Sequence, residues 1–293
     1  MRSEIEMMEL ILTVAREDER IRAVYLNGSR TNPNADKDIF QDYDVVYVVK
    51  ETESFIKDES WIDIFGERLY MQKPEEMDLI VGWECNIEKS YGYLIQFKDG
   101  NRMDLHVQTE DLCIKEVKED RLTKILMDKD NILPVIDEAS DKDHWVKKPT
   151  GKLFFRCCNE FHWCLNNVAK GLWRQEVTYA MDMINYCVRP ELLNMISWYA
   201  GMKNDFKISV GKSGKYLNKF ITKEMWDKYL KTYSTVEINK VWDSVFIMCE
   251  LFEEVSKEIA HEFGFEYNKE EAKNSLYYLK NVYNLPKNAK EVM

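Results

Sequence analysis

The spacing of hydrophobic and polar positions changes near the middle of the chain. The first part has short apolar runs separated by polar turns, and apolar residues beyond about residue 150 recur every three or four positions. Short apolar runs are typical of strands, whereas the 3.6-residue period is typical of helices. The pattern therefore predicts an α+β protein, in which an N-terminal domain with a mixed β-sheet and flanking helices precedes an all-helical C-terminal domain.

The N-terminal domain is expected to begin with a helix over residues 3–18. Ser3 and Glu6 form a Ser-x-x-Glu capping box at its start. Strands are predicted over Ile21–Leu26 and Asp42–Val49. The connection between these strands is too short for a parallel crossover, so we expect antiparallel or mixed pairing.

A hairpin is the strongest turn prediction in the chain. The β-prone runs Tyr93–Lys98 and Arg102–Val107 flank Asp99-Gly100-Asn101, a sequence that favours a tight turn.

The other predicted elements are a helix over 54–65, a strand over 68–72, a helix over 110–126, and helices over 150–170, 176–187, 190–202, 213–220, 222–232 and 237–262. An acidic, proline-containing stretch predicts a linker over 136–149 between domains 1–135 and 150–293.

Asp-x-Asp pairs occur four times, and one of them differs from the rest. Three are Asp-Lys-Asp in polar surroundings, which is typical of solvated loops: Asp36/Asp38, Asp128/Asp130 and Asp141/Asp143. Asp42 and Asp44 instead open a valine-rich strand, where they face the same side about 7 Å apart. Carboxylates at the entry of a buried strand are unfavourable without a partner or a metal. This pair therefore predicts a site for divalent cations.

The turn after the first strand offers a second chemical feature. Gly28-Ser29 ends that strand, and a glycine turn can bring backbone N–H groups close to a phosphate. Hard cations beside such a turn favour phosphoryl or nucleotidyl transfer.

A third acid, Asp104, lies on the second strand of the hairpin. Strand alternation places it on one face with Arg102 and His106, opposite the apolar residues. A lone acid in this position is commonly a solvent-facing residue. The alternative is that Asp104 joins Asp42 and Asp44, either as a third metal ligand or as the general base. His106 is assigned no role.

Composition and charge narrow the class of protein. The 293 residues are 45% hydrophobic and 13% aromatic, as in a packed globular protein, and carry a net charge of −11. This charge disfavours a nucleic-acid-binding protein and suits a cationic substrate. Seven cysteines without a Cys-x-x-Cys motif predict neither a disulfide framework nor a zinc site. With no apolar run long enough for a membrane span and no signal-peptide pattern, we expect a cytoplasmic protein without a membrane partner.

Several segments of the chain resemble a known family. Gly28-Ser29, Asp42-Tyr-Asp44 and Asp104 follow the pattern of the DNA polymerase β-like nucleotidyltransferase superfamily. Longer segments are similar to the bacterial aminoglycoside 6-adenylyltransferases, the streptomycin-modifying enzymes. These segments are Gly28-Ser-Arg-Thr-Asn, Phe40-Gln-Asp-Tyr-Asp44, Met71-Gln-Lys-Pro-Glu75, Lys170-Gly-Leu and Val188-Arg-Pro-Glu-Leu-Leu193. Similar segments extend from the first helix to about residue 260, so the resemblance covers most of the chain.

The resemblance implies an activity, with ATP as co-substrate and Mg²⁺ as cofactor. Enzymes of this family transfer AMP from Mg-ATP to a hydroxyl of streptomycin and release pyrophosphate. By this resemblance Asp42 and Asp44 would hold Mg²⁺, and Asp104 would be the third acid and a candidate base. The expected contacts with the ATP phosphates come from Gly28, Ser29 and Arg30. The helical domain would close over the nucleotide and supply the antibiotic pocket.

Three lysines of the helical domain are further candidates for binding the triphosphate: Lys170, Lys212 and Lys215. The simpler interpretation of each is a solvated lysine. Gly211-Lys212-Ser213 is not a P-loop, because Phe206 stands where the first glycine of that motif belongs.

The antibiotic itself suggests what its pocket should contain. Streptomycin carries two guanidinium groups, which bind to carboxylates and aromatic faces. Glu160 with Trp163 and Trp173 with Asp182 are the candidate pairs, and the first pair shares a helical face. The simpler interpretation of these acids is that they are solvated.

Two other functions remain open. The same chemistry could act on another acceptor, such as a different aminocyclitol, a lincosamide-like drug or a protein side chain. The chain could also be a nucleotide-binding regulator that has lost catalysis, although a regulator has no chemical need for three clustered acids. The sequence makes no prediction of oligomeric state.

Overall fold

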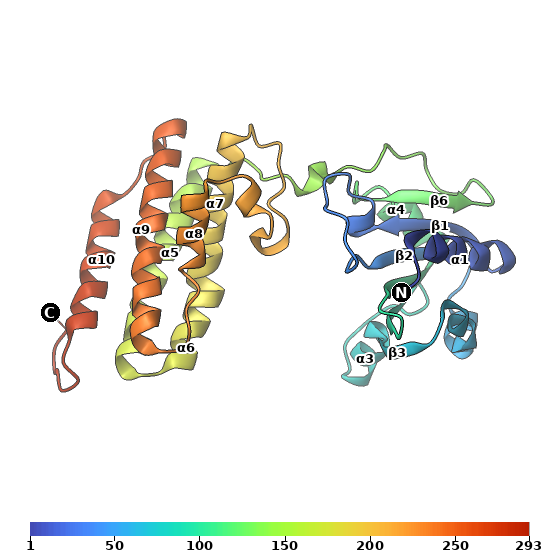
Figure 1. Ribbon diagram of the computed structural model, residues 1–293, viewed down its shortest axis with the longest axis horizontal. Helices are drawn as coiled ribbons and strands as arrows, with labels where there is room; N and C mark the ends of the chain where they lie inside the picture. Colours follow the sequence, from blue (N-terminus) through green and yellow to red (C-terminus); the bar gives the residue numbers. More distant parts are fainter. Residues whose placement is uncertain (293) are drawn as a thin grey trace. The chain divides into compact units, whose positions relative to one another are not determined.

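The computed structural model describes residues 1–292 and divides into two compact units (Figure 1). The first unit is Met1–Asp143, and the second begins at His144. The point of division lies within the 136–149 stretch. Elements of the first unit form a sheet with flanking helices, and the second unit is built from helices.

A six-stranded sheet forms the centre of the N-terminal unit, in the order β3-β4-β5-β2-β1-β6. Its strands are β1 Ile21–Asn27, β2 Tyr43–Val49, β3 Arg68–Gln72, β4 Ser90–Phe97, β5 Arg102–Thr109 and β6 Lys124–Asp128. Neighbouring strands are antiparallel except for the central pair β2 and β5, which is parallel. The sheet is therefore mixed, and the predicted α+β class is confirmed.

The two faces of this sheet differ in how they are covered. Helix α1 (Glu4–Glu17), capped by Ser3 as predicted, packs on the larger core together with α2 (Glu53–Lys57) and η2 (Glu59–Phe65). The opposite face carries a smaller apolar cluster around Tyr25, to which α4 (Glu110–Glu116) contributes Cys113. Strand alternation thus leaves polar side chains on this second face, near the starts of β2 and β5.

Two predictions for the N-terminal unit are wrong in part. The helix expected over 54–65 is broken at Asp58, whose side chain accepts a hydrogen bond from the Ser60 N–H and begins the 3₁₀ segment η2. The helix expected over 110–126 ends early: α4 covers Glu110–Glu116, and residues 124–128 form β6. A short apolar run fits either structure, and β6 forms because the outer edge of β1 offers backbone partners. The short helix α3 (Pro74–Ile80) was not predicted.

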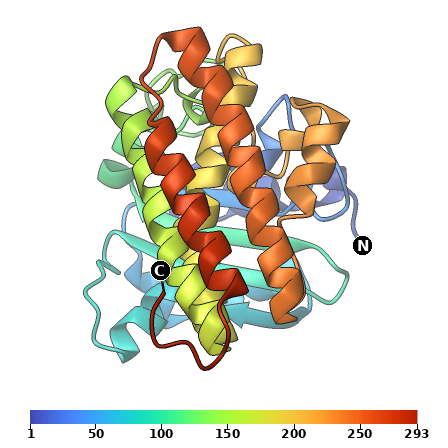
Figure 2. The same cartoon turned by 90° about the vertical axis from the view of Figure 1, so that its left-hand side faces the viewer.

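The second unit is a packed set of helices. They are α5 Gly151–Arg174, α6 Val177–Asp182, the π-helical turn η4 Met183–Val188, α7 Arg189–Lys203, α8 Lys223–Leu230, α9 Ile238–Phe263 and α10 Lys269–Asn284. Figure 2 shows α5, α9 and α10 running beside one another. The stacked rings of Phe161 and Phe252, 3.7 Å between centroids, join α5 to α9 in the core.

The helix expected over 213–220 is wrong. Two 3₁₀ turns, Lys212–Gly214 and Leu217–Lys219, stand in its place. Ser213 and Gly214 have φ values of 58° and 74°, which an α-helix does not allow. Among residues 1–292, no helix combines the length and apolar character needed to cross a membrane.

Candidate active site

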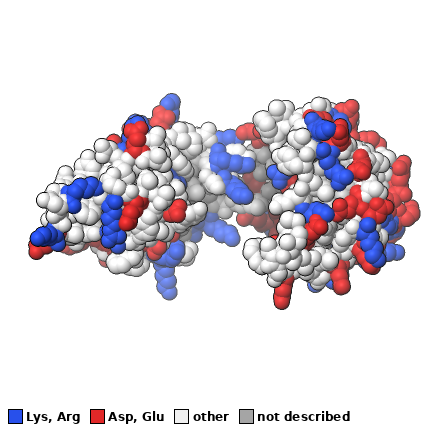
Figure 3. Space-filling view, turned by 90° about the horizontal axis from the view of Figure 1, so that it is seen from below, with Lys and Arg blue, Asp and Glu red and all other residues white. Residues whose placement is uncertain are grey.

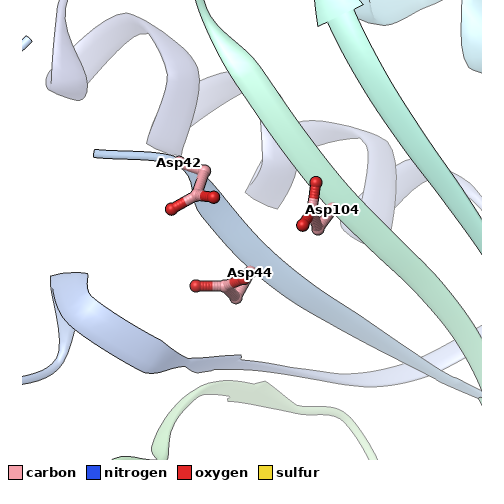
Figure 4. A group of neighbouring side chains, drawn as sticks. All are labelled: Asp42, Asp44 and Asp104. Carbon is pink, nitrogen blue, oxygen red and sulfur yellow. The ribbon is translucent and has the colours of Figure 1, made fainter. Parts of the chain in front are cut away.

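Three carboxylates meet on the second face of the sheet, at the starts of β2 and β5 (Figure 4). Asp44 and Asp104 are direct partners in the parallel pairing of these strands, so their side chains stand next to each other. Asp42 precedes Asp44 by two residues and points to the same side. One oxygen from each residue lies within 4.8 Å of the others. The structure thus brings Asp104 together with the Asp42/Asp44 pair.

The Gly28 turn lies directly against this cluster. Asn27, the last residue of β1, pairs with Asp44, and the 3₁₀ turn η1 (Gly28–Arg30) follows at once. Gly28 has a φ of +75°, and a Cβ at this position would lie 2.1 Å from Oδ2 of Asp44. Only glycine satisfies both the backbone angle and the space. Its lack of a side chain allows the backbone to approach the carboxylate closely.

Side-chain hydroxyls fix the turn to the segment before β6. Oγ1 of Thr31 lies 2.8 Å from the carbonyl oxygens of both Gly28 and Leu122. Thr123 is buried and donates a hydrogen bond to Oδ1 of Asn27 at 2.9 Å. Both ends of the turn are therefore held in place, which preorganises the backbone beside Asp44.

The electrostatics of the cluster are unbalanced. Burial, and after it the neighbouring charges of Asp42 and Asp104, raise the pKa of Asp44 to about 7. Arg102 and Arg30 act in the opposite direction and offset only part of this effect. Three carboxylates this close favour the binding of a cation.

Arg102 supplies the positive charge nearest to the cluster. Its Nε and Nη2 donate hydrogen bonds to the two oxygens of Asp104 at 2.9 and 2.6 Å. The same Nε lies 3.7 Å from Oδ2 of Asp42. Strand alternation correctly places Arg102 on the face of Asp104, but no role was predicted for it. The Arg-x-Asp spacing on one strand was the available signal.

Arg30 has contacts that differ from the expected phosphate binding. Its side chain is only 9% exposed and donates hydrogen bonds to the carbonyl oxygens of Asp42 and Gln41, at 2.9 and 2.6 Å. The guanidinium also stacks on the ring of Tyr43, 3.6 Å from its centroid. Arg30 thus supports the segment that carries Asp42. A phosphate contact by this side chain would require it to leave these partners.

His106 continues the row of polar side chains from Asp104 along β5. It pairs with Gly92 of β4, where a Cβ would lie 2.8 Å from Nε2 of His106. Oε2 of Glu75 accepts a hydrogen bond from the Gly92 N–H at 2.9 Å. Gly92 therefore makes room for the imidazole, and Glu75 anchors α3 to the sheet.

Comparison with known proteins identifies the family. A family model described as streptomycin adenylyltransferase matches residues 1–282. The chain belongs to this family. The resemblance inferred from the sequence is confirmed, and with it the class of aminoglycoside nucleotidyltransferases.

Individual relatives match over nearly the full length. The aminoglycoside 6-adenylyltransferase of Campylobacter jejuni is 40% identical over 280 residues, 96% of each chain. Those of Bacillus subtilis and Staphylococcus aureus are each 39% identical, covering 91% and 97% of this chain and 93% and 99% of theirs. A crystal structure of an aminoglycoside 6-adenyltransferase from Bacillus subtilis aligns with 34% identity and a TM-score of 0.48, covering 97% of this chain and all of that one.

In this member of the adenylyltransferase family, the three candidate lysines lie in the helical unit. Lys170 is half-buried near the end of α5, and Lys212 and Lys215 are exposed on the loop around the first 3₁₀ turn. The Nζ of Lys215 lies 5.0 Å from the ring centroid of Tyr216.

The candidate antibiotic-binding residues have different surroundings. Trp163 is 68% exposed on α5, and the neighbouring Glu160 accepts a hydrogen bond from the thiol of Cys164 at 3.3 Å. Trp173 is partly buried and donates its indole N–H to the carbonyl oxygen of Leu285 at 3.1 Å. Asp182 is exposed at the end of α6. Each pair thus has one exposed and one half-buried member, and Trp173 anchors the C-terminal segment.

The π-helical turn η4 was not predicted from the sequence. It links α6 to α7 without interruption, so the helices predicted separately over 176–187 and 190–202 are continuous. Cys187 in this turn raises the pKa of Cys164, after the larger effects of burial and of Glu160, which places η4 beside α5. Turns of this kind are frequent at functional sites, and their sequences carry no simple pattern.

Proposed function

We propose that the chain transfers AMP from Mg-ATP to a hydroxyl of an aminoglycoside, and specifically to the 6-position of streptomycin. The observation that carries this proposal is the meeting of Asp42, Asp44 and Asp104 beside the Gly28 turn. Membership of the streptomycin adenylyltransferase family supports the substrate class, because the relatives are named aminoglycoside 6-adenylyltransferases.

The residues of the cluster fit Mg²⁺. Carboxylate oxygens are its preferred protein ligands, and oxygens within 4.8 Å of one another can share a single ion. Arg102 already places a cation against two of the three acids. Asp42 and Asp44 would hold the metal, with Asp104 as third acid. When bound, Mg²⁺ would neutralise charge that develops at the α-phosphate.

The reaction is an in-line displacement at the α-phosphorus of ATP. The acceptor oxygen forms a bond to this phosphorus, the bond to the bridging oxygen breaks, and pyrophosphate leaves. The hydroxyl proton goes to a carboxylate, for which Asp104 is the candidate base if it is not a metal ligand. Backbone N–H groups at Gly28 and Ser29 would position the phosphates. Lys170, Lys212 and Lys215 are proposed to add positive charge from the helical unit.

A cationic acceptor matches the charge of the protein. Figure 3 shows acidic side chains spread over the visible face of the N-terminal unit, with basic ones among them. In the helical unit, Glu160 and Trp163 would bind a guanidinium group by charge and ring stacking. Trp173 and Asp182 are retained as the second pair, although the N–H of Trp173 already has a partner. Because the co-substrate is ATP, we propose that the enzyme works in the cytoplasm.

Pyrophosphate release tests the proposal. Purified protein with Mg-ATP and streptomycin should release pyrophosphate, and Asp42→Asn should abolish the release. Release with other aminoglycosides but not with streptomycin would change the acceptor and leave the chemistry intact. ATP binding without release across an antibiotic panel would overturn the enzymatic function and favour a regulator.

A further inference from the structure

We propose that Arg102 is a built-in counter-ion of the acid cluster, whose charge it partly neutralises in the absence of metal and which it must leave when a metal binds. Arg102 would therefore set the metal affinity of the site. The inference rests on the metal-binding part of the proposed function, and not on the identity of the acceptor.

The contacts of Arg102 lie where a metal would lie. A shared ion has to sit among the oxygens of Asp42, Asp44 and Asp104, which are within 4.8 Å of one another. The Nε of Arg102 is 2.9 Å from Oδ1 of Asp104 and 3.7 Å from Oδ2 of Asp42, so it lies between two of these acids. A guanidinium and a divalent cation repel each other at such distances. Both groups therefore compete for the same carboxylates.

Arg102 is placed so that it can move away. Its side chain is 50% exposed, and among residues 1–292 its ion pairs go to Asp104 and Asp42. The residue begins β5, directly after the hairpin turn. Arg30, the other arginine beside the cluster, is 9% exposed and bonded to backbone carbonyls. One arginine is thus fixed support, and the other is an exchangeable charge.

Replacement of Arg102 by the metal explains how three carboxylates can lie together before a metal binds. Without a nearby cation, three carboxylates at this spacing would repel one another and destabilise the starts of β2 and β5. A bidentate arginine stabilises them, and its loss on metal binding weakens that binding by the free energy of the broken ion pair. A residue that merely orients Asp104 for the metal would have the opposite effect, because its removal would weaken metal binding.

Manganese binding to the full chain without nucleotide distinguishes these two roles. Free Mn²⁺ is measured by electron paramagnetic resonance for the wild type and for Arg102→Gln. We expect the Mn²⁺ Kd of Arg102→Gln to fall about tenfold, as removal of one competing charge a few ångströms away implies. Arg102→Lys, which keeps the charge but not the bidentate geometry, should give an intermediate Kd. Arg22→Gln, which removes an arginine paired with Asp130, is the matched control and should leave the Kd unchanged.

Thermal unfolding gives a second measurement. With a chelator present, Arg102→Gln should have a lower Tm than the wild type, and saturating Mn²⁺ should raise its Tm by a larger amount. An unchanged or weaker Mn²⁺ affinity in Arg102→Gln would overturn the proposal. If Arg102→Gln does not fold, the test uses Arg102→Lys. A Mn²⁺ Kd of Arg102→Lys equal to or above that of the wild type would then overturn the proposal.

Failure of the inference can be separated from failure of the proposed function. Tighter Mn²⁺ binding without pyrophosphate release on any antibiotic would leave the counter-ion role standing and overturn the enzymatic function. If the wild type releases pyrophosphate but Arg102→Gln binds Mn²⁺ with an unchanged Kd, the enzymatic function stands and the counter-ion role is overturned. Loss of Mn²⁺ binding in Asp42→Asn shows that the titration measures this cluster, whereas retained binding would remove the basis of the inference.

Discussion

Two Asp-x-Asp pairs of the N-terminal unit have the same spacing but opposite surroundings. Asp128 is the last residue of β6 and Asp130 follows the strand. The carboxylate of Asp128 accepts hydrogen bonds from backbone N–H groups, including that of Leu133 at 2.8 Å. Asp130 receives two hydrogen bonds from the guanidinium of Arg22, at 2.6 and 2.5 Å. Every charge of this pair has a partner, and Arg22 lowers the pKa of Asp130.

Asp42 and Asp44 form the opposite case. With Asp104 they place three carboxylates around one exchangeable arginine, and the pKa of Asp44 rises to about 7. Spacing alone therefore does not make a site. A site arises where the fold concentrates charges that the protein itself does not balance, because an external cation can then supply the missing charge.

The largest difference in activity is expected between variants that neutralise one acid of each pair. Asp42→Asn should lower kcat by about a thousandfold or more, since metal stabilisation of the reaction contributes several kcal/mol. Asp130→Asn should retain activity within about twofold, because its partner Arg22 is remote from the cluster. The measurement is pyrophosphate release under saturating substrates. Equal losses of kcat in the two variants would show that the two pairs do not differ in their role in the reaction.

Crowding the cluster should give the next largest effect. In Gly28→Ala the new Cβ would meet Oδ2 of Asp44 at 2.1 Å, so the carboxylate has to move. We expect a loss of activity of about 10- to 100-fold, since small displacements of catalytic groups have effects of this size.

Gly82→Ala is the matched control for backbone strain. Gly82 has a φ of +81°, close to the +75° of Gly28, but nothing lies within 4 Å of a Cβ there. This variant should lose about 1 kcal/mol of stability and keep its activity. Comparable activity losses in Gly28→Ala and Gly82→Ala would show that strain, and not contact with Asp44, makes Gly28 necessary.

The two pairs should also respond to pH with opposite signs. Without metal, Asp44 binds its proton more tightly in the folded state, so its contribution to the free energy of unfolding falls as pH rises from about 4 to about 7. Asp44→Asn should therefore be more stable than the wild type at pH 8 with chelator, by on the order of 2 kcal/mol, and about equally stable near pH 4.

Asp130 should behave in the other direction. Its folded pKa is lowered, so its stabilising contribution is present above the unfolded value of 3.8 and is lost as pH falls through the folded pKa. Asp130→Asn should thus lose stability at neutral pH and approach the wild type in acid. Urea unfolding at several pH values measures both effects. If the wild type has a larger free energy of unfolding than Asp44→Asn at pH 8, the charge of Asp44 is balanced in the folded state and the prediction is wrong.

The smallest expected effect belongs to the balanced pair. Arg22→Gln removes an ion pair at the surface, and such pairs contribute little to stability. We expect a decrease in Tm of about 1–3 °C and no change in pyrophosphate release. A large drop in activity would show that the region after β6 takes part in the reaction.

Local patterns predicted the elements that carry the site. The capping box at Ser3, the valine-rich strand after Asp44 and the Asp99-Gly100 hairpin depend on neighbouring residues, and each is present in the structure. The meeting of Asp104 with Asp44 follows from the parallel pairing of β2 and β5. Sequence spacing could only offer this as an alternative, because it does not show which strands are neighbours.

Other features depend on contacts between distant segments. Residues 124–128 form a strand because β1 has a free edge, which a helical pattern does not reveal. The sequence did not show that Arg30 holds backbone carbonyls whereas Arg102 pairs with the acids. Arg30 is buried against backbone carbonyls and Arg102 is half exposed on Asp104, and only the fold separates these environments.

Anomalous diffraction from crystals grown with Mn²⁺ and a non-hydrolysable ATP analogue would show whether the acid cluster holds the metal. We expect a manganese peak about 2.0–2.4 Å from carboxylate oxygens of Asp42 and Asp44, with the guanidinium of Arg102 no longer bidentate on Asp104. A nucleotide bound without manganese at Asp42 and Asp44, or manganese at Asp128 and Asp130 instead, would contradict this expectation.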